Sequence, residues 1–255
     1  MTERLATDLG TTVAGVRLPF CAMNASGAWS STAAQLRELA RSGAGAIVLK
    51  TATAHPFLHP EYRSLHNPGH AAFLPLVREV AAQAPCPVIA SIAGASVEEY
   101  AALARAFAEA GAAIVEMNCA DSYVAATLAP CEERATLRAL LAKVVASCPV
   151  PLSVKLPERP ALPYRALDAE LAAAGVRVVV ARNEFAGFEK LLLEARSDLE
   201  VIAVGGIQCG YDVSRALAKG AKAVQVGSAL VAEGPGIFAR LARDMRAARR
   251  EPGRG

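Results

Sequence analysis

The chain alternates short apolar runs with longer segments of helical periodicity. The apolar runs are rich in β-branched residues and predict strands at 17–23, 46–50, 87–91, 113–117, 151–156, 177–181, 200–204 and 223–226. Between them, segments such as Val97–Ala110 and Leu137–Ser147 show the spacing of amphipathic helices. Eight strands that alternate with helices predict a closed parallel barrel of the (β/α)8, or TIM-barrel, class. No GxGxxG motif follows the first strand, which argues against a doubly wound sheet.

The chain length fits one such barrel, because (β/α)8 domains commonly need about 250 residues. We therefore expect residues 1–255 to form a single domain, with a basic C-terminal tail from about residue 249. Two segments fall outside the repeat. Residues 5–16 predict an N-terminal β-hairpin that plugs the bottom of the barrel, and residues 52–72 predict a long functional loop after the second strand.

Composition and charge narrow the class of protein. Hydrophobic residues make up 53% of the chain and the net charge of +3 is dispersed, which predicts neither a nucleic-acid nor a membrane partner. No apolar stretch is long enough to span a bilayer, no signal-peptide pattern begins the chain, and the six cysteines lack metal-ligand spacing. These features predict a cytoplasmic protein with reduced thiols. The histidines are expected to be solvated loop residues, so no metal site is predicted; they stand at 55, 59, 66 and 70.

The last two predicted strands end in glycine or in glycine followed by a small hydroxyl residue. They lie in the segments Val201–Gly210 and Ala221–Leu230. Glycine lets backbone N–H groups approach an anion, and the N-terminus of a following helix adds positive potential. Because the corresponding strands of (β/α)8 barrels often bind phosphate, we expect a phosphate cup here and a phosphorylated ligand or cofactor.

Polar side chains at other strand ends add candidate chemistry. Lys50 and Lys155 end the second and fifth predicted strands, and a buried lysine without a partner is costly, so both are expected to face a ligand. Glu116 ends the fourth strand and could either form a salt bridge with one of these lysines or take part in catalysis. Small residues from Asn24 to Gly27 leave room for a flat ligand.

Taken in order along the chain, these strand ends resemble the dihydroorotate dehydrogenase family, most closely its soluble class 1 branch. The matching motifs are Asn24-Ala-Ser-Gly27, Val48-Leu-Lys-Thr-Ala-Thr53, Asn67-Pro-Gly69, Glu116-Met-Asn118, Val154-Lys-Leu-Pro157, Val204-Gly-Gly-Ile207 with Gly210, and Val224-Gln-Val-Gly-Ser-Ala-Leu230 with Glu233-Gly-Pro235. The family is an FMN-binding barrel that oxidises dihydroorotate to orotate by hydride transfer to the flavin. The resemblance therefore implies FMN as cofactor here.

The resemblance also implies roles for individual positions. A cation at the N1/O2 edge of the flavin ring corresponds to Lys155, and an amide near both flavin and substrate corresponds to Asn118. Substrate contacts are implied for Lys50, Asn118 and Asn183. The implied cofactor-binding residues are Ala25, Ser26, Gly27, Lys50, Thr51, Asn118, Lys155, Gly205, Gly206, Gly227 and Ser228.

The chain departs from the family pattern in its substrate loops. The family has a Cys or Ser base three residues after the conserved Asn, followed by Pro and Asn, whereas this chain has Asp121, Ser122 and Tyr123. Asp121 could act as the base, or it could cap the following helix; Cys119 and Ser122 are alternative bases if the loop is displaced by one residue. The family's substrate-binding Asn in the loop after the second strand falls near Glu61. The substrate is therefore expected to be dihydroorotate or a related small cyclic compound.

Two other functions remain open at this level. The phosphate cup also suits a Schiff-base lyase or aldolase on a phosphorylated substrate, with Lys155 as the amine. A flavin-binding paralogue without turnover is the other alternative. Class 1 relatives form dimers or pair with an electron-transfer subunit, so a homodimer or such a partner is implied. The chain has no cysteine cluster for an iron–sulfur centre, which would then lie on another protein.

Overall fold

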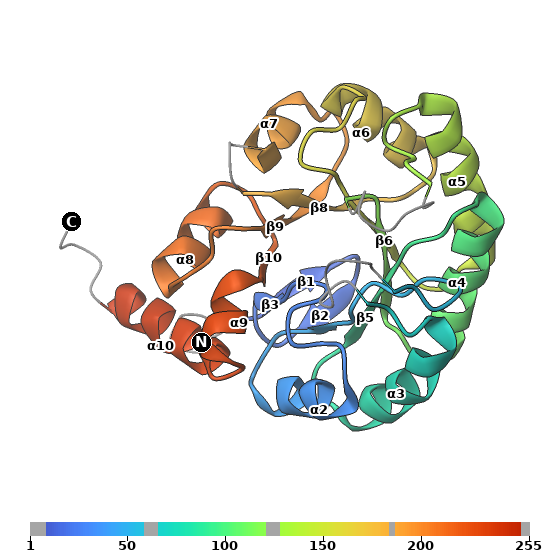
Figure 1. Ribbon diagram of the computed structural model, residues 1–255. Helices are drawn as coiled ribbons and strands as arrows, with labels where there is room; N and C mark the ends of the chain where they lie inside the picture. The colour runs from blue at the N-terminus through green and yellow to red at the C-terminus, as the bar shows by residue number, and fades with distance from the viewer. Residues whose placement is uncertain (1–8, 59–65, 121–127, 184–186, 251–255) are drawn as a thin grey trace.

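The computed structural model describes residues 9–58, 66–120, 128–183 and 187–250, and its centre is an eight-stranded parallel sheet. The strands follow the order β3-β10-β9-β8-β7-β6-β5-β4, and helices surround them (Figure 1). The strand bounds are β3 Ala22–Asn24, β4 Ile47–Val48, β5 Val88–Ile92, β6 Ile114–Asn118, β7 Leu152–Lys155, β8 Val178–Arg182, β9 Glu200–Val204 and β10 Ala223–Val226. The predicted (β/α)8 barrel is confirmed.

Amphipathic helices form the outer ring of the barrel. Their bounds are α2 Ala33–Arg41, α3 His70–Gln83, α4 Val97–Glu109, α5 Arg134–Ser147, α6 Tyr164–Ala173, α7 Gly187–Glu194, α8 Gly210–Ala218, α9 Ser228–Glu233 and α10 Ile237–Arg250. Within the described part of the chain, no helix combines the length and the apolar character needed to cross a bilayer.

The N-terminal hairpin plugs the barrel as expected, but its predicted bounds were wrong. It consists of β1, Thr11–Val13, and β2, Val16–Leu18, joined by Ala14 and Gly15 at φ of 49° and 78°. Two left-handed residues in a two-residue loop match the twist of paired strands. The predicted strand 17–23 therefore divides into β2 and β3, because Pro19 cannot donate to a strand ladder. Residues 5–8 of the predicted hairpin lie outside the described residues.

The hairpin belongs to the interior of the barrel. Val13 and Leu18 are fully buried and pack in the apolar cluster that contains Ile114 of β6 and Val178 of β8. The backbone N–H of Ala14 donates to Glu200 Oε2 at 2.7 Å, which ties the hairpin turn to the first residue of β9. This cluster closes the amino-terminal end of the barrel to water.

The barrel closes between β3 and β4 through a side chain as well as the backbone. Asn24 Nδ2 donates to the Val48 carbonyl at 2.6 Å, and the Val48 N–H donates to Asn24 Oδ1 at 2.8 Å. Below this pair, the Gly45 N–H donates to the Ala22 carbonyl at 2.8 Å. A Cβ on Gly45 would lie only 1.6 Å from the Phe20 carbonyl oxygen. Closure therefore requires an amide at residue 24 and glycine at residue 45.

The interior of the barrel changes from apolar to polar along the strands. Ile89 of β5 pairs in register with Ile114 of β6, and two residues further Ser91 pairs with Glu116. In the next strand pair, Asn118 lies beside Lys155 at the carboxyl end. Since successive inward-facing residues are two apart, polarity increases toward the carboxyl-terminal rim. That rim is where (β/α)8 barrels place their functional groups.

We expect Gly45→Ala to destabilise the protein by about 3–5 kcal/mol, because the added methyl group collides with backbone rather than with a flexible side chain. Urea unfolding followed by circular dichroism measures this change. Gly236→Ala is the matched control, since a Cβ there meets no atom within 4 Å, and its effect should stay within about 1 kcal/mol. Equal stability of the two variants would contradict the proposed closure.

Candidate functional site

A buried hydrogen-bonded cluster joins the carboxyl ends of β4, β5 and β6. We call Thr51, Ser91 and Asn118 the rim cluster. Asn118 Nδ2 donates to Thr51 Oγ1 at 2.7 Å, and Thr51 Oγ1 lies 3.0 Å from Ser91 Oγ. The Ala120 N–H donates to Asn118 Oδ1 at 3.0 Å, so both ends of the Asn118 amide have fixed partners. Thr51 and Asn118, both predicted site residues, therefore lie together in the structure.

The Asn67-Pro-Gly69 motif fastens the long loop after β4 to this cluster. Asn67 Nδ2 donates to the Thr51 carbonyl, and Asn67 Oδ1 accepts the Gly69 N–H at 2.9 Å. Gly69 has φ of 81°, and a Cβ there would lie 2.9 Å from Pro56 N. The motif is thus a buried anchor for the loop. Asn67 and Ser91 are site residues that were not assigned a role from the sequence, although both stand in or beside its strand-end motifs.

Lys155 and Ser26, which the sequence placed on different loops of one site, form a direct contact. Lys155 ends β7, and its Nζ donates to Ser26 Oγ at 2.9 Å. The Ser26 loop is held against the barrel by the Ala25 N–H, which donates to the Val226 carbonyl at 2.8 Å. Gly27 follows with φ of 91°, a left-handed conformation that favours glycine. The cation at residue 155 therefore lies over small residues at the end of β3.

Lys50 is buried beside this region, with only 8% of its surface exposed. Its backbone N–H donates to the Ser30 carbonyl at 3.2 Å, which ties the end of β4 to the loop after β3. Glu116 is fully buried within the barrel and accepts a hydrogen bond from Gln225 Nε2 at 2.7 Å. Its predicted salt bridge with a lysine is therefore wrong: the partner of Glu116 is an amide from β10.

The residues of the predicted phosphate cup lie in two neighbouring segments at the ends of β9 and β10. Gly205 and Gly206 have φ of 99° and 65°. The strand register pairs Gln225 with Val204, so Gly227 and Gly206 both lie two residues beyond a paired position. A Cβ on Gly227 would lie 3.8 Å from the Ala25 Cβ, which brings the cup close to the end of β3.

Asn183 forms hydrogen bonds with the first segment of the cup. Its N–H donates to the Val204 carbonyl at 2.7 Å, and its Nδ2 donates to the Gly205 carbonyl at 3.1 Å. The side-chain amide therefore holds the first glycine of the cup in place. A role of Asn183 in binding substrate stays a prediction.

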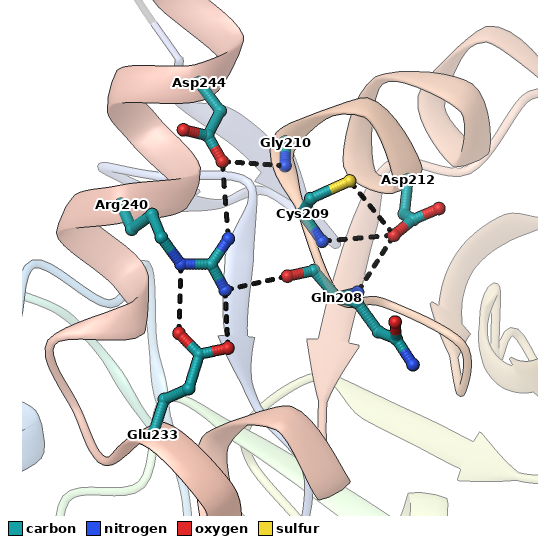
Figure 2. Close-up of polar contacts among 7 residues, drawn as sticks. All are labelled: Gln208, Cys209, Gly210, Asp212, Glu233, Arg240 and Asp244. Atoms are coloured by element: carbon teal, nitrogen blue, oxygen red, sulfur yellow. Dashed lines mark hydrogen bonds and ion pairs between the residues drawn. The ribbon is translucent and has the colours of Figure 1, made fainter.

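The N-terminus of α8 does not contribute to the cup in the way predicted (Figure 2). Its donors already bind the protein's own carboxylates: Gln208 N and Cys209 N donate to Asp212 Oδ2 at 3.0 and 3.1 Å, and Gly210 N donates to Asp244 Oδ2 at 3.3 Å. Burial opposes ionisation of Asp212, but these N–H groups hold its pKa below the ordinary value. The positive end of α8 is thus neutralised internally.

Other backbone donors in the cup are available for an anion. None of the hydrogen bonds between described residues is donated by the N–H groups of Gly206, Ile207, Ser228 or Ala229. The first intrahelical bond of α9 runs from Val231 N to the Gly227 carbonyl at 3.1 Å. Backbone N–H groups without protein acceptors at neighbouring strand ends are the kind of donors that bind a phosphate-sized anion.

Of the three candidate bases, the structure describes only Cys119. Asp121 and Ser122, together with Glu61 and Tyr123, lie outside the described residues. The helix after β6 begins at Arg134 with Glu133 as its N-cap, so the alternative that Asp121 caps this helix is wrong. A hydrogen bond with the Cys131 thiol, followed by burial, raises the pKa of Cys119 well above its ordinary value. This shift disfavours the thiolate, which is the form of Cys119 that would accept a proton.

The described histidines, at 55, 66 and 70, are not part of any metal-binding group. His70 is the first residue of α3, and its Nδ1 lies 2.7 Å from the Ala54 carbonyl oxygen, so it is a structural residue rather than a solvated one. His59 lies outside the described residues. Among the residues that the structure describes, no group of three or more His, Cys, Asp or Glu side chains is arranged to hold a metal ion.

The fold and these contacts define a (β/α)8-barrel protein with a lysine-bearing polar cluster and adjacent glycine-rich strand ends at its carboxyl-terminal rim. The family model described as dihydroorotate dehydrogenase matches residues 185–248, which include both cup segments. The catalytic subunit of dihydroorotate dehydrogenase B (NAD(+)) from Methanothermobacter thermautotrophicus is 29% identical over 289 residues, covering 94% of this chain and 92% of the relative. Dihydroorotate dehydrogenase A (fumarate) from Lactococcus lactis subsp. lactis is 27% identical, with 93% of each chain covered.

A solved structure supports the fold independently. The DHODH of Eimeria tenella in complex with ferulenol superposes with a TM-score of 0.80 at 15% identity, covering 93% of this chain and 83% of that one. The chain is thus similar along nearly its whole length to proteins named dihydroorotate dehydrogenases, and its fold matches that of a solved DHODH. Its alignment with the archaeal relative is longer than the chain itself, so that relative carries internal segments that this protein lacks.

We expect the rim cluster to contribute measurably to the free energy of unfolding. We expect Thr51→Val to lower the free energy of unfolding by about 1–3 kcal/mol, because the buried Asn118 amide loses its acceptor. Thr136→Val is the control: that hydroxyl donates to Glu133 at the start of α5, on the surface, and its loss should cost less than about 1 kcal/mol. Urea denaturation checks both, and a Thr51→Val variant as stable as the control would argue against the cluster.

Proposed function

We propose that this protein is an FMN-dependent oxidoreductase that converts dihydroorotate to orotate. The observation that carries the proposal is the similarity to dihydroorotate dehydrogenases over nearly the whole chain. The geometry of the rim supports it, because a lysine, an amide and an anion cup lie around one end of the barrel. The Schiff-base lyase has no comparable support among the relatives.

The described residues fit FMN in two respects. The free N–H groups of the cup, at Gly206, Ile207, Ser228 and Ala229, suit its single phosphate group. The small residues Ala25 and Gly27, with Gly227 nearby, leave space for a flat ring at the end of β3. When bound, FMN would supply a two-electron acceptor for hydride.

The chain's own groups have defined roles in this proposal. Lys155, held by Ser26, supplies positive charge at the edge of the ring where negative charge develops on reduction. Asn118, with both ends of its amide fixed by Thr51 and Ala120, orients the ligand with little reorganisation. Lys50 and Asn183 are proposed to contact the substrate side of the site.

Asp121 is the proposed base that removes a carbon-bound proton from the substrate. It occupies the position of the family's base, and the proposal is supported by α5, which begins at Arg134 with Glu133 rather than Asp121 as its N-cap. A carboxylate shielded from water has a raised pKa and is a stronger base than one in solution. Cys119 is the weaker candidate, since its raised pKa disfavours the thiolate.

We expect the purified protein to carry a flavin absorption band that bleaches when dihydroorotate is added without oxygen. An anaerobic visible spectrum before and after addition measures this directly. A band that persists would retain the FMN barrel and reject dihydroorotate as substrate. No band after FMN is supplied would reject the proposed function. Adding fumarate or NAD(+) to the bleached protein then identifies the acceptor, because relatives of both kinds are similar to this chain.

Asp121→Asn should slow flavin reduction by dihydroorotate by about 100-fold or more while FMN remains bound, because the variant keeps the size of the side chain and loses the base. Cys119→Ser is the comparison, and its rate should stay within a few-fold of the wild type. Stopped-flow absorbance at the flavin band measures both rates. Should Cys119→Ser be the slow variant and Asp121→Asn the fast one, the base would be reassigned to residue 119.

A further inference from the structure

Arg240 of α10 joins three segments next to the phosphate cup (Figure 2). Its Nε and Nη2 donate to the two oxygens of Glu233 at 2.9 and 2.7 Å. Nη2 also donates to the Gln208 carbonyl at 2.8 Å, and Nη1 lies 3.4 Å from Asp244 Oδ2. Its guanidinium donors are thus directed at protein acceptors on α9, on the β9–α8 loop and on α10.

The two segments that Arg240 connects are the two arms of the cup. Gln208 directly follows Ile207 in the first arm, and its carbonyl oxygen is fixed by the guanidinium. Glu233 is the last residue of α9, a six-residue helix whose first residue is Ser228 in the second arm. A contact at the end of so short a helix also fixes its start. One side chain therefore sets the spacing between the two groups of cup N–H donors.

The same contacts balance charge beside the cup. Glu233 and Asp244 both form ion pairs with Arg240. Asp244 also accepts a hydrogen bond from the Gly210 N–H at 3.3 Å. A phosphate monoester brings about −1.5 to −2 charges at pH 7. Without the guanidinium, two carboxylates near the cup would repel that charge, and Gln208 would lose its link to Glu233.

We propose that Arg240 is a positioning residue for the phosphate group of the cofactor: it holds the two arms of the cup at the spacing that a single phosphate requires. This inference rests on the proposed function, because it takes FMN as the ligand. It also explains the Glu233-Gly-Pro235 motif at the end of α9, since Glu233 is the bidentate partner of Arg240.

Comparison of FMN with riboflavin separates this role from a general structural one. Riboflavin has the same ring and lacks the phosphate, so a residue that acts on the cup alone should affect only FMN. The measurement is the Kd of each flavin for the apo-protein, from titration of flavin fluorescence. The fluorescence of Trp29, the single tryptophan of the chain, gives a second signal. Its ring lies near the end of α9, about 4 Å from the position of a Cβ on Gly234.

We expect Arg240→Gln to raise the Kd of FMN by about tenfold or more and that of riboflavin by less than about twofold. Glu233→Gln should change FMN affinity in the same direction by a smaller factor. Arg240→Lys keeps the charge without the planar fork and should recover only part of the affinity. The matched control is Arg105→Gln, which removes an exposed pair with Glu109 on α4 and should change neither Kd.

Equal weakening of FMN and riboflavin would assign Arg240 a structural role and overturn the inference, as would unchanged FMN affinity. If Arg240→Gln does not fold, Arg240→Lys and Glu233→Gln carry the same comparison of the two flavins. Failure of the wild-type protein to bind FMN would overturn the proposed function and the inference with it. Wild-type binding with no effect of these variants would overturn the inference alone.

Discussion

Closure of the barrel between β3 and β4 is the constraint on which the rest of the structure depends. The Asn24 side chain takes the place of ladder hydrogen bonds by pairing with both the N–H and the carbonyl of Val48, and Gly45 allows the backbones to approach. Only a closed barrel brings the ends of all eight strands to one rim. The loops after β3 and β4 then meet, as the bond between Lys50 N and the Ser30 carbonyl shows.

The interior of the closed barrel is apolar at its amino-terminal end and polar at its carboxyl-terminal end. The hairpin and the inward apolar residues exclude water from the amino-terminal end, where unpaired polar groups would be costly. Toward the other end, hydroxyl, amide and ammonium groups replace them, and the side chains of Thr51, Asn118 and Lys155 bind partners on a neighbouring strand or loop. This gradient supplies rigid polar groups at the rim. Such groups stabilise developing charge without having to reorganise.

The segments of the predicted phosphate cup are held in place by residues of the outer helices as well as by the barrel strands. Carboxylates of Asp212 and Asp244 take the α8 donors, and Arg240 links the two arms through Gln208 and Glu233. The cup is thereby restricted to N–H groups of its own two arms, which suits one phosphate group. Asn183 fixes the first glycine from the side of β8. Helix α10 thus contacts the segments that follow β9 and β10 although it lies outside the barrel.

The sequence by itself determined the repeating pattern and the chemistry of the strand ends. Periodicity identified the barrel, and residues such as Lys155, Asn118 and Gly206 were recognised because inward-facing polar or glycine residues stop the apolar runs. Only the tertiary structure decided which groups form hydrogen bonds with one another. Glu116 pairs with Gln225, which lies 109 residues away, and Gly210 with Asp244, which follows 34 residues later. The physical reason is that local periodicity fixes the face on which a side chain lies. Its contacts depend on strand register and helix packing, which are set by the whole chain.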